Sequence, residues 1–131
     1  MRPPTPTTVE SKIAARSYRD LIVWQKAICL VTDVYRCTEA FPKNEVYGLT
    51  PQLRRAAVSV PSDIAEGQGR LSTGEFKRFL GHAKGSLHEL RTQLVIAENL
   101  GYLQSAQKEK LLDASTEVDR MLSGLLSSLT T

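Results

Sequence analysis

Apolar residues recur at alternating steps of three and four along most of this chain, a spacing that places them on one face of an α-helix. The most regular run predicts a helix from Thr73 to about Leu100, whose apolar face consists of Phe76, Leu80, Ala83, Leu87, Leu90, Leu94 and Ala97. The same spacing predicts three further helices, over residues 18–38, 50–66 and 105–129. Since the connections are short and no stretch has the alternation of a β-strand, residues 18–131 are predicted to form an all-α, antiparallel, up-and-down four-helix bundle.

The connection between the second and third predicted helices carries the clearest boundary signals. Thr50 is a suitable N-cap for the second helix, and Gly67 is suited to the left-handed conformation that closes one. Ser72 and Glu75 have the spacing of a capping box for the third helix. We therefore expect a helical hairpin with a short turn.

The third predicted helix contains two glycines in its first half. Gly81 and Gly85 leave that half thin, so we expect a neighbouring backbone to approach it closely. Gly101 follows the last apolar position and is placed to cap the end of the helix.

The first predicted helix is apolar over about half of its circumference, more than the roughly 100° of an ordinary surface helix. One stripe begins at Leu21, and a second stripe beside it contains Val23, Ala27, Leu30 and Val34. A helix this apolar has to contact more than one neighbour, so it is either the central helix of the bundle or partly covered by another subunit. From the first stripe we assign a candidate oligomer interface, made of Trp24, Ile28, Val31 and Tyr35.

The 131 residues, 41% hydrophobic and 24% charged, are typical of one globular domain. Residues 1–17 are rich in proline and threonine and predict a flexible N-terminal tail. No apolar run approaches the roughly 18 residues of a membrane helix, and the N-terminus lacks the apolar region of a secretory signal. Cys29 and Cys37 lie about 12 Å apart on one predicted helix, too far for a disulfide. We therefore expect a cytoplasmic protein without membrane, metal or cofactor.

The formal net charge is only +3, but positive charge is concentrated in two segments, residues 1–19 and residues 54–91, each with a net charge of +3. Lys77, Lys84 and Arg91 repeat every seven residues along one flank of the third predicted helix. Arg54 and Arg55 flank the core face of the second. A further arginine lies in the turn between these helices, where exposed helix N–H groups also attract anions. The set predicts contacts to nucleic-acid phosphates, by Arg54, Arg55, Arg70, Lys77, Lys84 and Arg91.

Three segments of the chain resemble the 23S rRNA intervening-sequence proteins over roughly residues 18–103. They read YRDLIVWQKAICL, VYGLTPQLRRAAVSVPSDIAEGQGR and GEFKRFLGHAKGSLHELRTQLVIAENLGYL. The resemblance implies a small cytoplasmic four-helix bundle that assembles as a ring-like homopentamer, with no established molecular role. It extends to the accessory variability proteins of diversity-generating retroelements, which bind nucleic acid. Asp63 departs from the family motif, which usually has asparagine before IAEG.

The sequence contains no recognisable catalytic constellation. His82 and His88 are about 120° apart on one helix and cannot share a metal ion. A group of acids with one histidine between the second and third helices is the one enzymatic alternative, and it comprises Asp63, Glu66, His82 and Glu89.

Three functional hypotheses follow. The first is a non-enzymatic, homo-oligomeric helical scaffold that contacts ribosomal RNA or another nucleic acid through phosphates. The second is an adaptor that binds another protein through the apolar face of the first helix. The third is an enzyme that uses the acid–histidine group, which requires those side chains to converge on a pocket.

Overall fold

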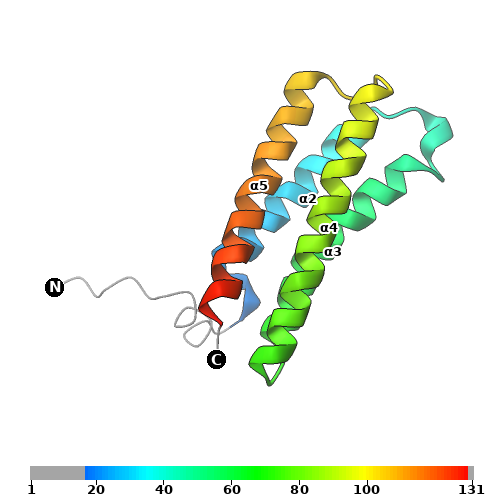
Figure 1. Ribbon diagram of the computed structural model, residues 1–131. Coiled ribbons are helices and arrows are strands. Elements are labelled where there is room, and N and C mark those ends of the chain that lie inside the picture. The colour runs from blue at the N-terminus through cyan, green and yellow to red at the C-terminus, as the bar shows by residue number, and fades with distance from the viewer. Residues whose placement is uncertain (1–16, 130–131) are drawn as a thin grey trace.

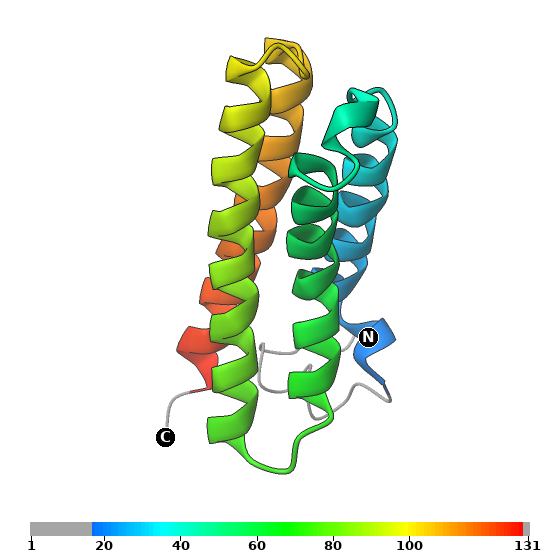
Figure 2. The same ribbon diagram turned by 90° about the vertical axis from the view of Figure 1, so that its right-hand side faces the viewer.

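The computed structural model describes residues 17–129. Its long helices are α2 (Ile22–Thr38), α3 (Leu49–Gln68), α4 (Thr73–Asn99) and α5 (Ser105–Ser128), with short 3-10 helices η1 (Tyr18–Asp20) and η2 (Lys43–Glu45). Consecutive long helices run in opposite directions, and the α3–α4 turn lies at the end opposite to the other two connections (Figures 1 and 2). The all-α four-helix architecture is confirmed, and residues 17–129 contain no strand. Nearly all of the predicted N-terminal tail lies outside the described residues.

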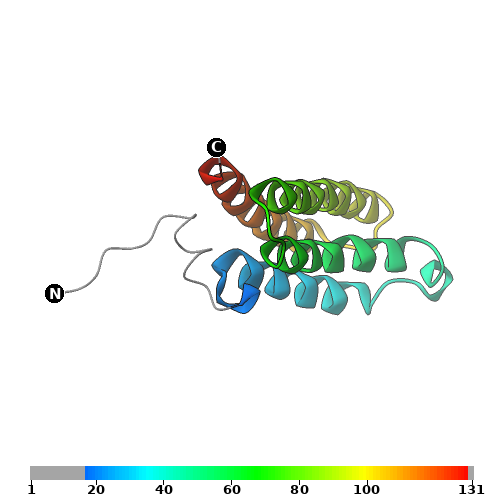
Figure 3. The same ribbon diagram turned by 90° about the horizontal axis from the view of Figure 1, so that it is seen from below.

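Each long helix packs mainly on two others. α2 lies against α3 and α5, and α4 lies against the same two helices. Viewed from below, the α3–α4 turn joins two neighbouring helices (Figure 3). α2 is therefore not a central helix surrounded by the others, which removes one of the two explanations for its wide apolar face. No described helix is long and apolar enough to cross a membrane.

The two ends of α3 differ from the prediction. The helix begins at Leu49 with Gly48 at its N-cap, and Glu45 Oε1 accepts the Leu49 N–H at 2.9 Å. Thr50 is therefore inside the helix, and its predicted capping role was wrong. At the other end the helix continues through Gly67 to Gln68, and the following Gly69 has a right-handed φ of −81°.

Gly67 serves close packing rather than helix termination. A Cβ atom added there would lie 2.8 Å from Cβ of Phe79 and 2.9 Å from Cδ1 of Phe76. The absence of a side chain thus lets the last turn of α3 lie directly on the first turns of α4. The expected close approach at Gly81 and Gly85 is not found among residues 17–129, because a Cβ atom at either position meets nothing within 4 Å there.

Both predicted boundaries of α4 are found, but only the serine half of the predicted capping box forms, because the Glu75 carboxylate pairs with Arg78 and does not accept the Ser72 N–H. Ser72 Oγ accepts the Glu75 N–H at 3.1 Å, which satisfies one of the N–H groups left free at a helix start. Gly101 has a φ of +80°, and the Tyr102 N–H donates to the Ala97 carbonyl at 2.9 Å, the bonding of a glycine C-cap. The helix is therefore bounded by local backbone chemistry at both ends.

The core is built from the predicted apolar faces. On α2 the buried stripe is the second one, since Val23, Ala27, Leu30 and Val34 are each at most 5% exposed. The residues of α4 that keep the regular spacing are all buried as well. Of the first stripe only Leu21 is buried in the core, and its remaining residues are half-buried or exposed and form part of a surface.

Candidate interaction surfaces

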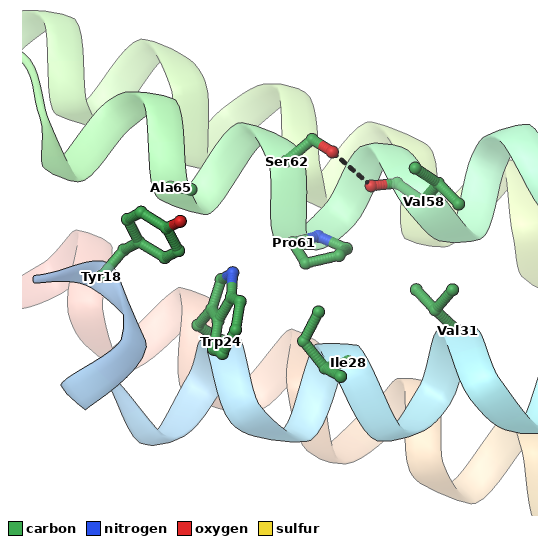
Figure 4. A pocket seen from close by; sticks show the side chains of 8 residues that line it. All are labelled: Tyr18, Trp24, Ile28, Val31, Val58, Pro61, Ser62 and Ala65. Carbon is green, nitrogen blue, oxygen red and sulfur yellow. Dashed lines mark hydrogen bonds between the residues drawn. The ribbon is translucent and has the colours of Figure 1, made fainter.

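The outward stripe of α2 and one side of α3 form an apolar groove with a volume of about 280 Å³ (Figure 4). We call this surface the α2–α3 groove, and its lining residues are Tyr18, Trp24, Ile28, Val31, Val58, Pro61, Ser62 and Ala65. The Ser62 hydroxyl donates to the Val58 carbonyl at 2.8 Å, so its hydrogen-bonding capacity is used within the helix. The groove therefore offers an apolar surface to whatever contacts it.

A proline and an alanine form part of the α3 side of the groove. Pro61 is buried and points toward α2, and Ala65 lies opposite Tyr18 (Figure 4). The Tyr18 ring meets the Trp24 ring edge-on, with centroids 5.2 Å apart. The α3 wall was not assigned from the sequence, although Val58, Pro61 and Ala65 recur at helical steps beside the core stripe of α3.

Three of the four residues assigned to the oligomer interface lie in this groove. Ile28 is 38% exposed, and Trp24 and Val31 are half-buried against the core. Tyr35 does not line the groove, and its ring lies under the guanidinium of Arg54, with Cζ 4.5 Å from the ring centroid. The structure thus brings Trp24, Ile28 and Val31 together and separates Tyr35 from them.

Two of the six predicted phosphate ligands are committed to contacts between helices. Arg54 Nε donates to Thr38 Oγ1 at 2.8 Å and its Nη2 to the Tyr35 carbonyl at 3.4 Å, so Arg54 caps the end of α2. Lys84 Nζ donates to Asp119 Oδ1 at 2.8 Å and to the hydroxyl of Ser123, which joins α4 to α5. The two side chains therefore lie on different flanks of the bundle.

The other four predicted ligands are more accessible. Arg55 and Lys77 are exposed and Arg91 is half-buried, and none of the three has an ion pair within residues 17–129. Arg70 stacks on Phe79, with its Cζ 4.7 Å from the ring centroid. The predicted set is thus not one continuous patch, and the row on α4 is interrupted where Lys84 is paired.

Arg78 was missed by the sequence reasoning. Its guanidinium lies over the same Phe79 ring as Arg70, 4.9 Å from the centroid, and pairs with Glu75 at 2.8 Å. Glu66 approaches Arg70 less closely, at 3.9 Å. The spacing of Glu75 and Arg78 along one helix was the available signal for the ion pair. The α3–α4 end is therefore a mixed-charge surface around an aromatic ring.

The acid–histidine group does not assemble as the enzymatic alternative requires. Burial raises the pKa of Asp63, His82 opposes this shift and Glu66 adds to it, so these three groups act on one another. Glu89 instead accepts from Gln93 Nε2 at 3.3 Å. Across residues 17–129, no group of three or more histidine, cysteine, aspartate or glutamate residues is placed to hold a metal ion. None of the four residues lines the groove.

Comparison with known proteins identifies a similar solved structure and the family of the chain. A crystal structure of a protein of unknown function from the S23 ribosomal protein family of Bacteroides thetaiotaomicron is similar, with a TM-score of 0.74. The match covers 84% of this chain and all of that one, at 20% sequence identity. No curated protein is similar enough to count as a relative. The model of the 23S rRNA-intervening sequence protein family matches residues 19–124, a span that includes nearly all four helices. The chain therefore belongs to the 23S rRNA-intervening sequence protein family.

Proposed function

We propose that this protein is a non-enzymatic scaffold that assembles with copies of itself through the α2–α3 groove. The observation that supports the proposal is the apolar, outward-facing surface formed by Trp24, Ile28 and Val31 beside Val58 and Pro61. α2 already buries a complete second stripe in the core, and Ile28 and Val58 beside it each remain 38% exposed to solvent. An exposed apolar surface of this kind is typical of a site of protein association.

The proposed assembly is a ring of five subunits, the state that the family resemblance implies. In a ring, each interface joins two different surfaces, so the groove of one copy contacts a second surface on its neighbour. Repetition of each subunit's basic side chains around the ring would raise avidity for a long polyanion.

The proposed partner of the assembled ring is nucleic acid, contacted through phosphates. Arg55, Lys77 and Arg91 support this role because they have no ion pair among the described residues. Lys84 and Arg54 are not included, since their donors are used between helices. Contacts to phosphates alone are not expected to select a base sequence.

The self-assembly proposal is tested with Ile28→Asp, measured by size exclusion with light scattering across a range of concentrations. Burial of a carboxylate in an apolar interface is strongly unfavourable, so we expect the variant to be monomeric where the unmodified protein is oligomeric. Ile22→Asp is the matched control, because Ile22 is on the same helix, 61% exposed and outside the groove. A monomeric unmodified protein would refute self-assembly and favour an adaptor that binds another protein through the groove.

The nucleic-acid proposal is tested by titration with ribosomal RNA fragments at several salt concentrations. Phosphate contacts release counterions, so the affinity should fall steeply as the salt concentration rises. Lys77→Glu should weaken binding to all fragments alike and reduce the salt dependence. Lys110→Glu makes the same charge change on α5, at an exposed residue outside the proposed set, and should change binding less. Binding that is insensitive to salt would refute phosphate contact.

A further inference from the structure

The described chain begins at one end of the α2–α3 groove. Ser17 and Asp20 cap η1 reciprocally, with the Arg19 N–H donating to Ser17 Oγ at 3.1 Å and the Ser17 N–H to Asp20 Oδ2 at 3.3 Å. Gln25 Nε2 donates to the Arg19 carbonyl at 2.8 Å, which fastens η1 to the first turn of α2. Tyr18, which directly follows Ser17, lines the groove. Any segment that precedes Ser17 therefore starts beside this apolar surface.

We propose that residues 9–16 of the same chain occupy the α2–α3 groove when no other copy covers it. This segment reads VESKIAAR, and its two large apolar residues are Val9 and Ile13. In extended chain, four residues span about 13 Å. Along α2, the seven residues from Trp24 to Val31 span about 10 Å. Val9 and Ile13 can thus reach the two ends of the groove at the same time, with Ile13 at the Trp24 end.

Because residues 9–16 belong to the same chain as the groove, even a weak contact between them leads to appreciable occupancy. Attachment through a few residues gives a tethered segment an effective concentration of about 1 mM, so a segment with an intrinsic dissociation constant near that value occupies the groove about half of the time. A second copy at micromolar concentration has to displace it. Because only the uncovered fraction is competent to associate, half-occupancy weakens assembly about twofold.

Whether this segment occupies the groove does not depend on the proposed self-assembly. The competition between the segment and a second copy rests on that proposed function. The two parts are therefore tested by different measurements. The first measurement asks where the segment lies, and the second asks how it affects association.

The position of the segment is tested with a photo-reactive amino acid at position 13 of the full chain. Equal amounts of unlabelled and isotope-labelled protein are mixed before irradiation, so that mass spectrometry separates adducts within one chain from adducts between chains. We expect adducts within one chain, on Trp24, Ile28 or Ala65. Adducts only between chains, or scattered over all helices, would overturn the proposal. The same substitution at position 2 is the control for random collision.

The effect on association is tested with Val9→Ser/Ile13→Ser and with removal of residues 1–16. Both should expose Trp24, the single tryptophan of the chain, to acrylamide quenching in dilute solution, and both should strengthen self-association about twofold. Thr7→Ser/Thr8→Ser is the matched control and should change neither. Unchanged quenching in both variants would overturn the proposal. A fully monomeric protein whose Trp24 responds as expected would support the seated segment and refute the proposed assembly.

Discussion

The contact of Gly67 with α4 leads to a quantitative prediction for Gly67→Ala. In a helix interior alanine is favoured over glycine by about 1 kcal/mol. At this position, however, the new methyl group would lie 2.8 Å from Cβ of Phe79, an atom close to the backbone that cannot move away cheaply. Overpacking of this kind costs about 1–3 kcal/mol. We therefore expect a net loss of about 1 kcal/mol in the free energy of unfolding.

The control for this prediction is Gly85→Ala. Gly85 lies within α4, and a Cβ atom there meets nothing within 4 Å, so only the helix-propensity gain of about 1 kcal/mol remains. Urea denaturation measures both variants, and a thermal midpoint should move by about 4 °C per kcal/mol for a domain of this size. A Gly67→Ala variant as stable as Gly85→Ala would refute the reasoning. If Gly85→Ala lost stability and Gly67→Ala did not, the result would indicate that another copy packs against α4 at Gly85.

Three further predictions concern buried polar groups and ion pairs. Gln93 is 6% exposed and its Oε1 has no hydrogen-bond partner within residues 17–129, so Gln93→Met should raise the free energy of unfolding by about 1 kcal/mol in urea denaturation. A clear loss of stability would show that another molecule supplies a donor to Oε1. A double-mutant cycle on Lys84 and Asp119, whose side chains are 27% and 22% exposed, should give a coupling of about 1 kcal/mol. The more exposed pair of Lys26 and Glu117 should give about 0.3 kcal/mol or less, and equal couplings would contradict the role of burial. Burial raises the pKa of Asp63 in the folded state, so folding favours the protonated carboxyl and the stability of the protein falls as the pH rises through that pKa. Asp63→Asn should therefore be more stable than the unmodified protein at pH 7. Denaturation measured at a series of pH values should show this advantage disappearing below about pH 3.8.

The helices and their order could be predicted because they depend on local spacing. Each of the four predicted segments corresponds to one long helix, and the capping serine Ser72 and the C-terminal Gly101 follow from residues adjacent in sequence. The ends of α3 could not be predicted in the same way. Leu49 is bonded by Glu45 across the turn, and Gly67 is constrained by two phenylalanines of another helix.

The candidate site was less predictable, because it depends on contacts between helices. Periodicity identified two apolar stripes on α2 but did not indicate which one faces the core. The seven-residue spacing predicted one row of Lys77, Lys84 and Arg91, yet nothing near Lys84 in the sequence identifies Asp119 as its partner. Likewise, the reach of Arg54 to Thr38 depends on the α2–α3 packing. Spacing therefore located the surfaces, while tertiary contacts decided which side chains remain available.

The close contact at Gly67 also makes the α3–α4 turn beside it a position where an insertion should be tolerated. Alignment of the two helices is set where the α3 backbone lies on Phe76 and Phe79, and Leu71 lies between Arg70, which contacts Phe79, and Ser72, which caps α4. Leu71, in the turn, is fully exposed to solvent. An epitope or a fluorescent label could consequently be inserted there without shifting the hairpin, and would report on the assembled protein from the end opposite the α2–α3 connection (Figure 2).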